Sequence, residues 1–188
     1  HYLVDDTVEV ADPYAPLILD PWNDGYIPAA AFPARPAFPW EHAAWPVGAF
    51  RTEEQAFDWT DAGFQRPSQD RLVIYEVLVR DWDAQRDFGE VIDRLDYLEW
   101  LGINAIELMP VNEFDGNTSW GYNPGPRLAV DKAYGTADAL RALVDGAHAR
   151  GIAVILDIVP NHSFGLDPLV RLYQDSDGGV SPGNPWFN

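Results

Sequence analysis

The sequence predicts an α/β fold in which parallel strands alternate with helices, and two observations carry that prediction. Residues 152–157 form an unbroken apolar run that ends in an aspartate, which is typical of a strand buried on both faces with polar groups at its carboxyl end. From residue 72 onward, such runs alternate with stretches that have helical spacing. This alternation implies parallel pairing with right-handed crossovers.

The first seventy residues lack this regular alternation of strands and helices. Residues 1–12 predict two short strands around a tight Asp-Asp turn, and we interpret them as the C-terminal remnant of an all-β module. Residues 13–70 carry most of the sixteen prolines, which interrupt both sheet ladders and helices. We therefore expect an ordered but irregular linker or wrap with room for one hairpin.

The regular elements expected next are strand 72–79, helix 88–101, strand 104–109, helix 137–151, strand 152–157 and helix 166–173. The first helix is expected to stop at Gly102, a C′ glycine. The second is expected to begin after Thr136, an N-cap residue. Pro110 closes the second strand.

Two parallel architectures fit these elements, a doubly wound nucleotide-binding sheet and a closed β/α barrel. A doubly wound sheet normally has a glycine-rich turn after its first strand, where a phosphate approaches the backbone. Residues 80–83 are instead Arg-Asp-Trp-Asp, and acidic, bulky side chains do not suit a pyrophosphate. Residues 71–188 are therefore predicted to form the N-terminal part of a (β/α)8 TIM barrel, with about three βα units.

Composition restricts the function classes. The 188 residues are 47% apolar, which is enough for a sizeable core, and the net charge is −18 with Lys132 as the only lysine. Such a surface repels phosphate backbones and anionic lipid, so we expect neither nucleic acid nor membrane partners. The same charge suits either general solubility or adaptation to high salt. The absence of cysteine excludes disulfides and thiolate chemistry and leaves the cellular location open.

The ends of the chain suggest a piece of a longer protein. The chain starts at His1, and its single methionine is Met109, so we expect a processed or truncated product. About three βα units leave a barrel open, with strand edges and apolar helix faces exposed. We therefore predict self-association, or association with the missing remainder of the barrel.

Three motifs occur in an informative order. Residues 73–82 precede Ser-Trp-Gly-Tyr-Asn-Pro at 119–124, which precedes Asp-Ile-Val-Pro-Asn-His at 157–162. They resemble, in turn, the first barrel strand, the loop after the second strand and the first conserved region of the α-amylase superfamily, glycoside hydrolase family thirteen. Tyr-Leu-Val-Asp at 2–5 and Ala-Asp-Pro-Tyr at 11–14 resemble the tail of an immunoglobulin-like, starch-associated module. The resemblance implies a retaining glycoside hydrolase that acts on α-glucans.

The resemblance also implies where catalysis takes place. Retaining glycosidases use one carboxylate as nucleophile and a second as acid and base. In this family these groups, and a third aspartate that stabilises the transition state, follow strands four, five and seven. We therefore expect none of them on this chain and predict that the 188 residues alone are inactive. A debranching or branching relative is an alternative, because Trp-Gly-Tyr-Asn-Pro also resembles the pullulanase loop. A non-catalytic carbohydrate-binding unit is a second alternative.

Three site residues follow from the resemblance. Tyr122 matches a tyrosine that stacks on a sugar ring, although loop packing could also place a tyrosine there. His162 matches a histidine that hydrogen-bonds a hydroxyl of the same sugar, with a purely structural role as the alternative. Asp157 matches an aspartate that orients neighbouring groups and is not the nucleophile; capping of local amides is the alternative.

Further residues are weaker candidates. Trp120 and Asn123 flank the tyrosine and are candidate substrate contacts. Asn161 matches a residue that gives its carbonyl oxygen to a structural calcium ion in many members, with loop hydrogen bonding as the alternative. No other cofactor is expected. Glu107 and Glu113 lie outside any matching motif, so we interpret them as solvated or ion-paired carboxylates.

Overall fold

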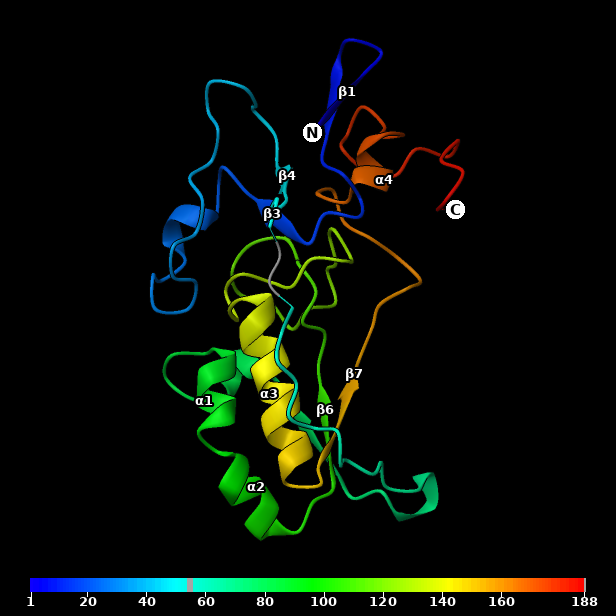
Figure 1. Cartoon of the computed structure of the whole chain (residues 1–188). Helices are drawn as coiled ribbons and strands as arrows, with labels where there is room; N and C mark the ends of the chain where they lie inside the picture. The colour runs from blue at the N-terminus through cyan, green and yellow to red at the C-terminus, as the bar shows by residue number, and fades with distance from the viewer. Residues whose placement is uncertain (54–55, 188) are drawn as a thin grey trace.

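A computed structural model describes residues 1–53 and 56–187 (Figure 1). Its central element is a three-stranded parallel sheet with the strand order β5, β6, β7. The strands are β5 (Ile74–Val77), β6 (Ala105–Leu108) and β7 (Ala153–Leu156). The parallel pairing and the alternation of strand and helix are therefore confirmed.

Helices cover one face of this sheet. These helices are α1 (Phe88–Ile92), α2 (Leu95–Leu101) and α3 (Ala137–Ala149), and all three contribute to the main core. Helix α4 (Pro168–Arg171) lies apart from the sheet and contacts β2 (Val8–Val10) instead (Figure 1). The core members that are most deeply buried include Val77, Phe88, Val91, Leu95, Leu98, Ile106, Leu108, Leu143 and Ala147. Alternate residues of β5 and β6 thus face the helices, as expected for a barrel wall.

The expected helix 88–101 is wrong as a single element, because the chain breaks between α1 and α2. The indole Nε1 of Trp82 donates to the carbonyl of Glu90 at 3.3 Å. The amide of Arg94, which would use that carbonyl in a regular helix, donates to Val91 instead at 3.1 Å. The expected stop at Gly102 is confirmed, since this glycine has a φ of +84°.

Helix α3 begins and ends close to its expected bounds. Thr136 caps it, with its hydroxyl accepting a hydrogen bond from the amide of Ala139 at 3.0 Å. The strand expected at 72–79 stops at Val77, because the chain turns into a short 3-10 helix, η3 (Val79–Asp81), that buries Val79. Helix α4 is shorter than expected. Asp167 caps its start, and the side-chain amide of Asn184 donates a hydrogen bond to the carbonyl of Leu169 near its end.

Residues 1–49 lie beside the carboxyl ends of the parallel strands, whereas residues 56–71 run along α3 to the opposite end of the sheet (Figure 1). Strands β1 (Tyr2–Val4) and β2 (Val8–Val10) pair antiparallel around the expected Asp-Asp turn, whose two residues have positive φ. Strands β3 (Leu17–Leu19) and β4 (Val47–Ala49) also pair antiparallel, although residues 20–46 separate them. Two 3-10 turns complete the segment, η1 (Asp24–Tyr26) and η2 (Gln69–Arg71). The domain boundaries at residues 12 and 70 stay predictions.

Large apolar side chains are exposed at the sheet edges and on α2. They include Ile74 on β5, Leu156 and Ile158 at β7, and Trp100, which is 80% exposed. Further βα units or a second copy of the chain would cover such surfaces, so the expected self-association stays a prediction. No helix within the described ranges combines the length and apolar character needed to cross a membrane.

Candidate functional site

The loops that follow β6 and β7 bring three of the predicted site residues together. The hydroxyl of Tyr122 donates to Oδ2 of Asp157 at 2.6 Å. Nε2 of His162 lies 2.8 Å from the backbone oxygen of Tyr122. The Tyr122 side chain nevertheless remains accessible, with 39% of the residue exposed. The result is an accessible tyrosine whose ring is held through its hydroxyl by Asp157 and whose backbone carbonyl is held by His162.

Asp157 owes its position to the parallel sheet. Its amide donates to the carbonyl of Leu108 at 2.9 Å, which extends the ladder between β6 and β7 by one step. The carboxylate therefore sits at the strand end, where parallel folds place their sites. The hydrogen bond to this carboxylate, reinforced by burial and by its negative charge, raises the pKa of Tyr122 to about 12. The hydroxyl is thus a neutral donor at any physiological pH.

The hydrogen bond of His162 fixes its tautomer. A backbone carbonyl can only accept, so Nε2 must carry the proton that it donates to Tyr122. In a neutral imidazole this leaves Nδ1 as an acceptor, and no hydrogen bond from a described residue reaches that atom. Nδ1 of His162 therefore keeps an acceptor position that no described residue fills.

Gly121 allows the loop to approach β6, a role that the sequence analysis did not identify. Its φ is +89°, a conformation that disfavours side chains. A Cβ atom there would lie 2.3 Å from the backbone oxygen of Pro110. The glycine beside Tyr122 in the motif was the available sign of this close approach.

The remaining candidates differ in accessibility. Trp120 is 57% exposed and lies next to Gly121, so it is free to contact a ligand. Both polar atoms of the Asn123 side chain form hydrogen bonds within the loop. Its Oδ1 accepts from the Ser119 hydroxyl, and its Nδ2 donates to the Asp115 carbonyl at 3.0 Å. These bonds favour a loop-supporting role for Asn123 over direct contact with substrate.

Asn161 is exposed, and its predicted part in a calcium site stays a prediction. Calcium requires six to eight oxygen ligands. Among residues 1–53 and 56–187, no three or more His, Asp or Glu side chains are grouped so that they could hold a metal ion. Carboxylates of the described residues therefore do not form a calcium site by themselves, and a site at Asn161 would need amide or backbone oxygens as further ligands.

Arg127 links the two site loops and was missed from sequence. Its Nη1 donates to Oδ2 of Asp167 at 2.6 Å, and its Nη2 donates to the carbonyl of His162 at 2.8 Å. The Asp167 side chain is buried and also accepts from the hydroxyl of Ser163 at 2.5 Å. Arg127 thus holds the backbone of the loop that carries His162.

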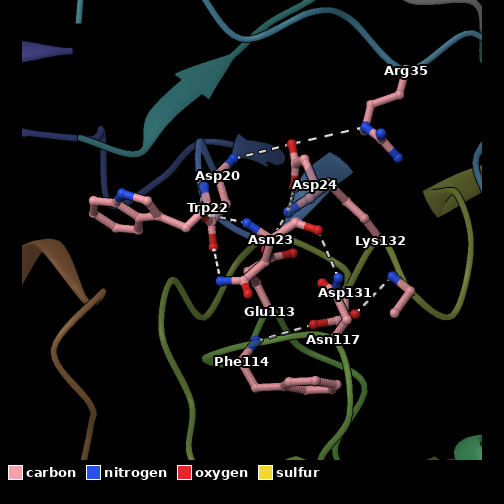
Figure 2. Close-up of polar contacts among 11 residues, drawn as sticks. Asp20, Trp22, Asn23, Asp24, Arg35, Glu113, Phe114, Asn117, Asp131 and Lys132 are labelled. Carbon is pink, nitrogen blue, oxygen red and sulfur yellow. Dashed lines mark hydrogen bonds and ion pairs between the residues drawn. The ribbon is translucent and has the colours of Figure 1, made fainter. Parts of the chain in front are cut away.

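A buried ionic cluster lies beneath the loop that follows β6 and carries Tyr122 (Figure 2). It surrounds Lys132, whose Nζ binds Glu113 and lies 3.3 Å from Oδ1 of Asp24. Burial raises the pKa of Glu113 to about 7, although the ammonium opposes this effect. Glu113 is ion-paired, as the sequence analysis allowed, but it is buried and cannot contact a ligand.

Asp115, next to this cluster, makes stability depend on pH. Burial raises its pKa from 3.8 to about 6, and its Oδ1 is buried without a hydrogen-bond partner. A raised acid pKa contributes stability below the unfolded value of 3.8 that is lost as the pH rises through 6. We expect Asp115→Asn to match wild type near pH 4 and to exceed it by about 1–3 kcal/mol at pH 8.

Urea denaturation between pH 4 and 8 measures this difference. Asp138→Asn, at an exposed position on α3, is the control and should run parallel to wild type. Parallel profiles for Asp115→Asn and wild type would contradict the expected titration of Asp115.

Comparisons with known proteins show the family of the chain and its fold. A family model for the alpha amylase catalytic domain matches residues 63–167. Malto-oligosyltrehalose trehalohydrolase of Saccharolobus solfataricus is 42% identical over 106 residues, which are 56% of this chain and 19% of that enzyme. The 1,4-alpha-glucan branching enzyme of Shewanella frigidimarina is 35% identical over 144 residues, covering 65% of this chain and 19% of that enzyme. The chain thus spans about a fifth of these relatives.

Two solved structures share the fold over almost the whole chain. A Salmonella typhimurium protein assigned as an alpha amylase has a TM-score of 0.71 and 26% identity, covering 98% of this chain and 28% of that chain. A Group B Streptococcus pullulanase has a TM-score of 0.64 and 25% identity, with the same coverage of each chain. Together with the family match, these likenesses confirm the predicted partial (β/α)8 barrel.

Proposed function

Because the chain belongs to the α-amylase catalytic-domain family, we propose that it supplies the sugar-binding part of a glycoside hydrolase that acts on α-glucans. The observation that carries this proposal is the fixed, exposed ring of Tyr122 above the carboxyl ends of the strands. Aromatic faces pack well against the apolar C–H faces of a pyranose. The neighbouring Asp157 and His162 supply polar groups for its hydroxyls.

The three residues have separate roles in this proposal. Tyr122 provides the stacking surface, and its own hydroxyl is held by Asp157. Asp157 is a positioning residue, because its carboxylate accepts from the tyrosine hydroxyl and fixes the ring. His162 offers Nδ1 as an acceptor, since Nε2 is bound to the Tyr122 carbonyl.

Calorimetric titration with maltoheptaose tests the proposal on the 188-residue chain. We expect Tyr122→Ala to weaken binding about tenfold, because loss of one aromatic contact costs roughly 1.4 kcal/mol. Tyr122→Phe retains the ring face and should have a smaller effect. Tyr14→Ala removes an exposed tyrosine outside the motifs at 119–124 and 157–162 and should bind like wild type. Equal affinity of Tyr122→Ala and wild type, or no binding by wild type, would refute the proposed site.

A reducing-sugar assay separates binding from hydrolysis. We expect the 188 residues to release no sugar from amylose, because the family's catalytic carboxylates are assigned to later strands. A longer product of the same reading frame that includes those strands is expected to release it. Release by the 188 residues alone would show that the catalytic groups are already present on them.

A second candidate is a protein that acts on α-1,6 branch points. Two observations favour it, the 35% identity to a branching enzyme and the fold match to a pullulanase over 98% of this chain. Cleavage of pullulan in preference to amylose by the longer product would favour a debranching activity. Transfer of glucan without net release of reducing ends would favour a branching activity.

A further inference from the structure

The turn at residues 20–24 is a rigid part of the N-terminal segment. Oδ1 of Asp20 accepts from the amide of Trp22 at 2.7 Å, and Oδ2 accepts from the side-chain amide of Asn23 at 2.8 Å. Oδ2 of Asp24 accepts from the amide of Asp20 at 3.1 Å, which closes the turn. Asp20 and Asp24 are both buried, so water does not compete for these bonds.

This turn contacts the Tyr122 loop at two separate points (Figure 2). Near the tip of the loop, the side-chain amide of Asn117 donates to the carbonyl of Asn23 at 2.7 Å. At the base of the loop, Lys132 lies between Asp24 and Glu113 and is itself 2% exposed. The chain's only lysine is therefore used to join the N-terminal turn to the site loop.

The loop transmits these two contacts to Tyr122 because it folds back on itself. Phe114 forms an antiparallel bridge with Pro124, and the amide of Asp115 donates to the carbonyl of Asn123 at 3.3 Å. The outgoing limb, which carries Asn117, thus holds the returning limb, which carries Tyr122. Fixing the outgoing limb at its base and near its tip restricts where the returning limb can lie.

We propose that turn 20–24 is a positioning element of the site, which holds the loop so that the Tyr122 hydroxyl reaches Asp157 and the ring faces the ligand. The identity of the ligand as an α-glucan rests on the proposed function. The placement of the Tyr122 ring is independent of the proposed function, because it follows from contacts within the chain. The N-terminal segment accordingly acts on the site without touching the substrate.

Two variants of the 188-residue chain test this inference. Asn117→Ala removes a single half-buried hydrogen bond near the loop tip, and Asp24→Asn removes the charge that faces Lys132. Asp96→Asn is the control, because it breaks an exposed ion pair with Arg150 between α2 and α3. In each protein, tyrosines labelled with 13C at the hydroxyl-bearing carbon are observed by NMR, and Tyr122→Phe assigns the Tyr122 resonance. Maltoheptaose affinity is measured in parallel.

We expect Asn117→Ala and Asp24→Asn to shift the Tyr122 resonance toward that of an exposed tyrosine and to weaken maltoheptaose binding about 2-fold to 30-fold. Asp96→Asn should leave both unchanged. An unchanged Tyr122 resonance in folded Asn117→Ala overturns the inference, even if Asp24→Asn fails to fold. A shifted resonance in a chain that never binds maltoheptaose supports the positioning role and overturns the proposed function. Normal maltoheptaose binding with an unchanged Tyr122 resonance in the variants supports the proposed function and overturns the positioning role.

Discussion

Gly121→Ala is expected to destabilise the chain by about 3–5 kcal/mol and to abolish the hydrogen bond between Tyr122 and Asp157. Two effects combine at this position. A residue with a side chain is strained at a φ of +89°. The new Cβ would also lie 2.3 Å from the Pro110 carbonyl oxygen and 2.7 Å from its Cβ, and Pro110 follows two residues after the end of β6. The loop must therefore move away from β6, and Tyr122 must move with it.

Gly116→Ala is a matched control within the same loop. Gly116 has a similar φ of +84°, but a Cβ added there meets nothing within 4 Å. Backbone strain alone should cost about 1–2 kcal/mol. Chemical denaturation and the Tyr122 resonance should therefore distinguish the variants, with a large loss and a shifted resonance for Gly121→Ala alone. Equal losses for the two variants would show that the contact with Pro110 is relieved without displacing the loop.

The sequence alone predicted where the candidate site lies and which three residues form it. The apolar run that ends at Asp157 placed this carboxylate at a strand end, because in parallel sheets the polar residues gather there. The motif around Tyr122 and the one that ends at His162 indicated residues that the structure brings together. The apolar run depends on short-range order along the chain, which a sequence displays directly. The two motifs were identified instead through their resemblance to the α-amylase superfamily.

The contacts missed from sequence join segments far apart in the chain. Asn117 and its partner Asn23 are separated by 94 positions, and Arg127 and Asp167 by 40. No local periodicity marks either pair. The break between α1 and α2 was missed although its partner is near in the chain, because the helical spacing of residues 88–101 does not show that the Trp82 indole, eight positions before Glu90, takes the Glu90 carbonyl. Local patterns therefore predicted the strands and the helical faces but not the contacts that adjust them.

Lys132→Met is expected to lower the free energy of unfolding by about 3–5 kcal/mol at pH 8, because it leaves buried carboxylates without their cation. Glu113 is buried, and Asp24 and Asp131 are buried around the same ammonium. Methionine fills a similar volume, so the effect reports charge rather than a cavity. Arg150→Met, which breaks the exposed pair with Asp96, is the control and should cost no more than about 1 kcal/mol.

The pH dependence of the Lys132→Met variant separates lost ion pairing from a general packing defect. The ammonium lowers the pKa of Glu113, which burial holds at about 7, so its removal must raise that pKa further. An acid with a raised pKa in the folded state contributes stability below its unfolded value of 4.5 that is lost as the pH rises through the folded value. In urea denaturation, the free energy of unfolding of the variant should therefore approach that of wild type near pH 4. Above pH 4 it should fall steadily further below the wild-type value. A deficit that is constant from pH 4 to 8 would instead mean that methionine disturbs the packing, and that the ammonium is not what joins turn 20–24 to the site loop.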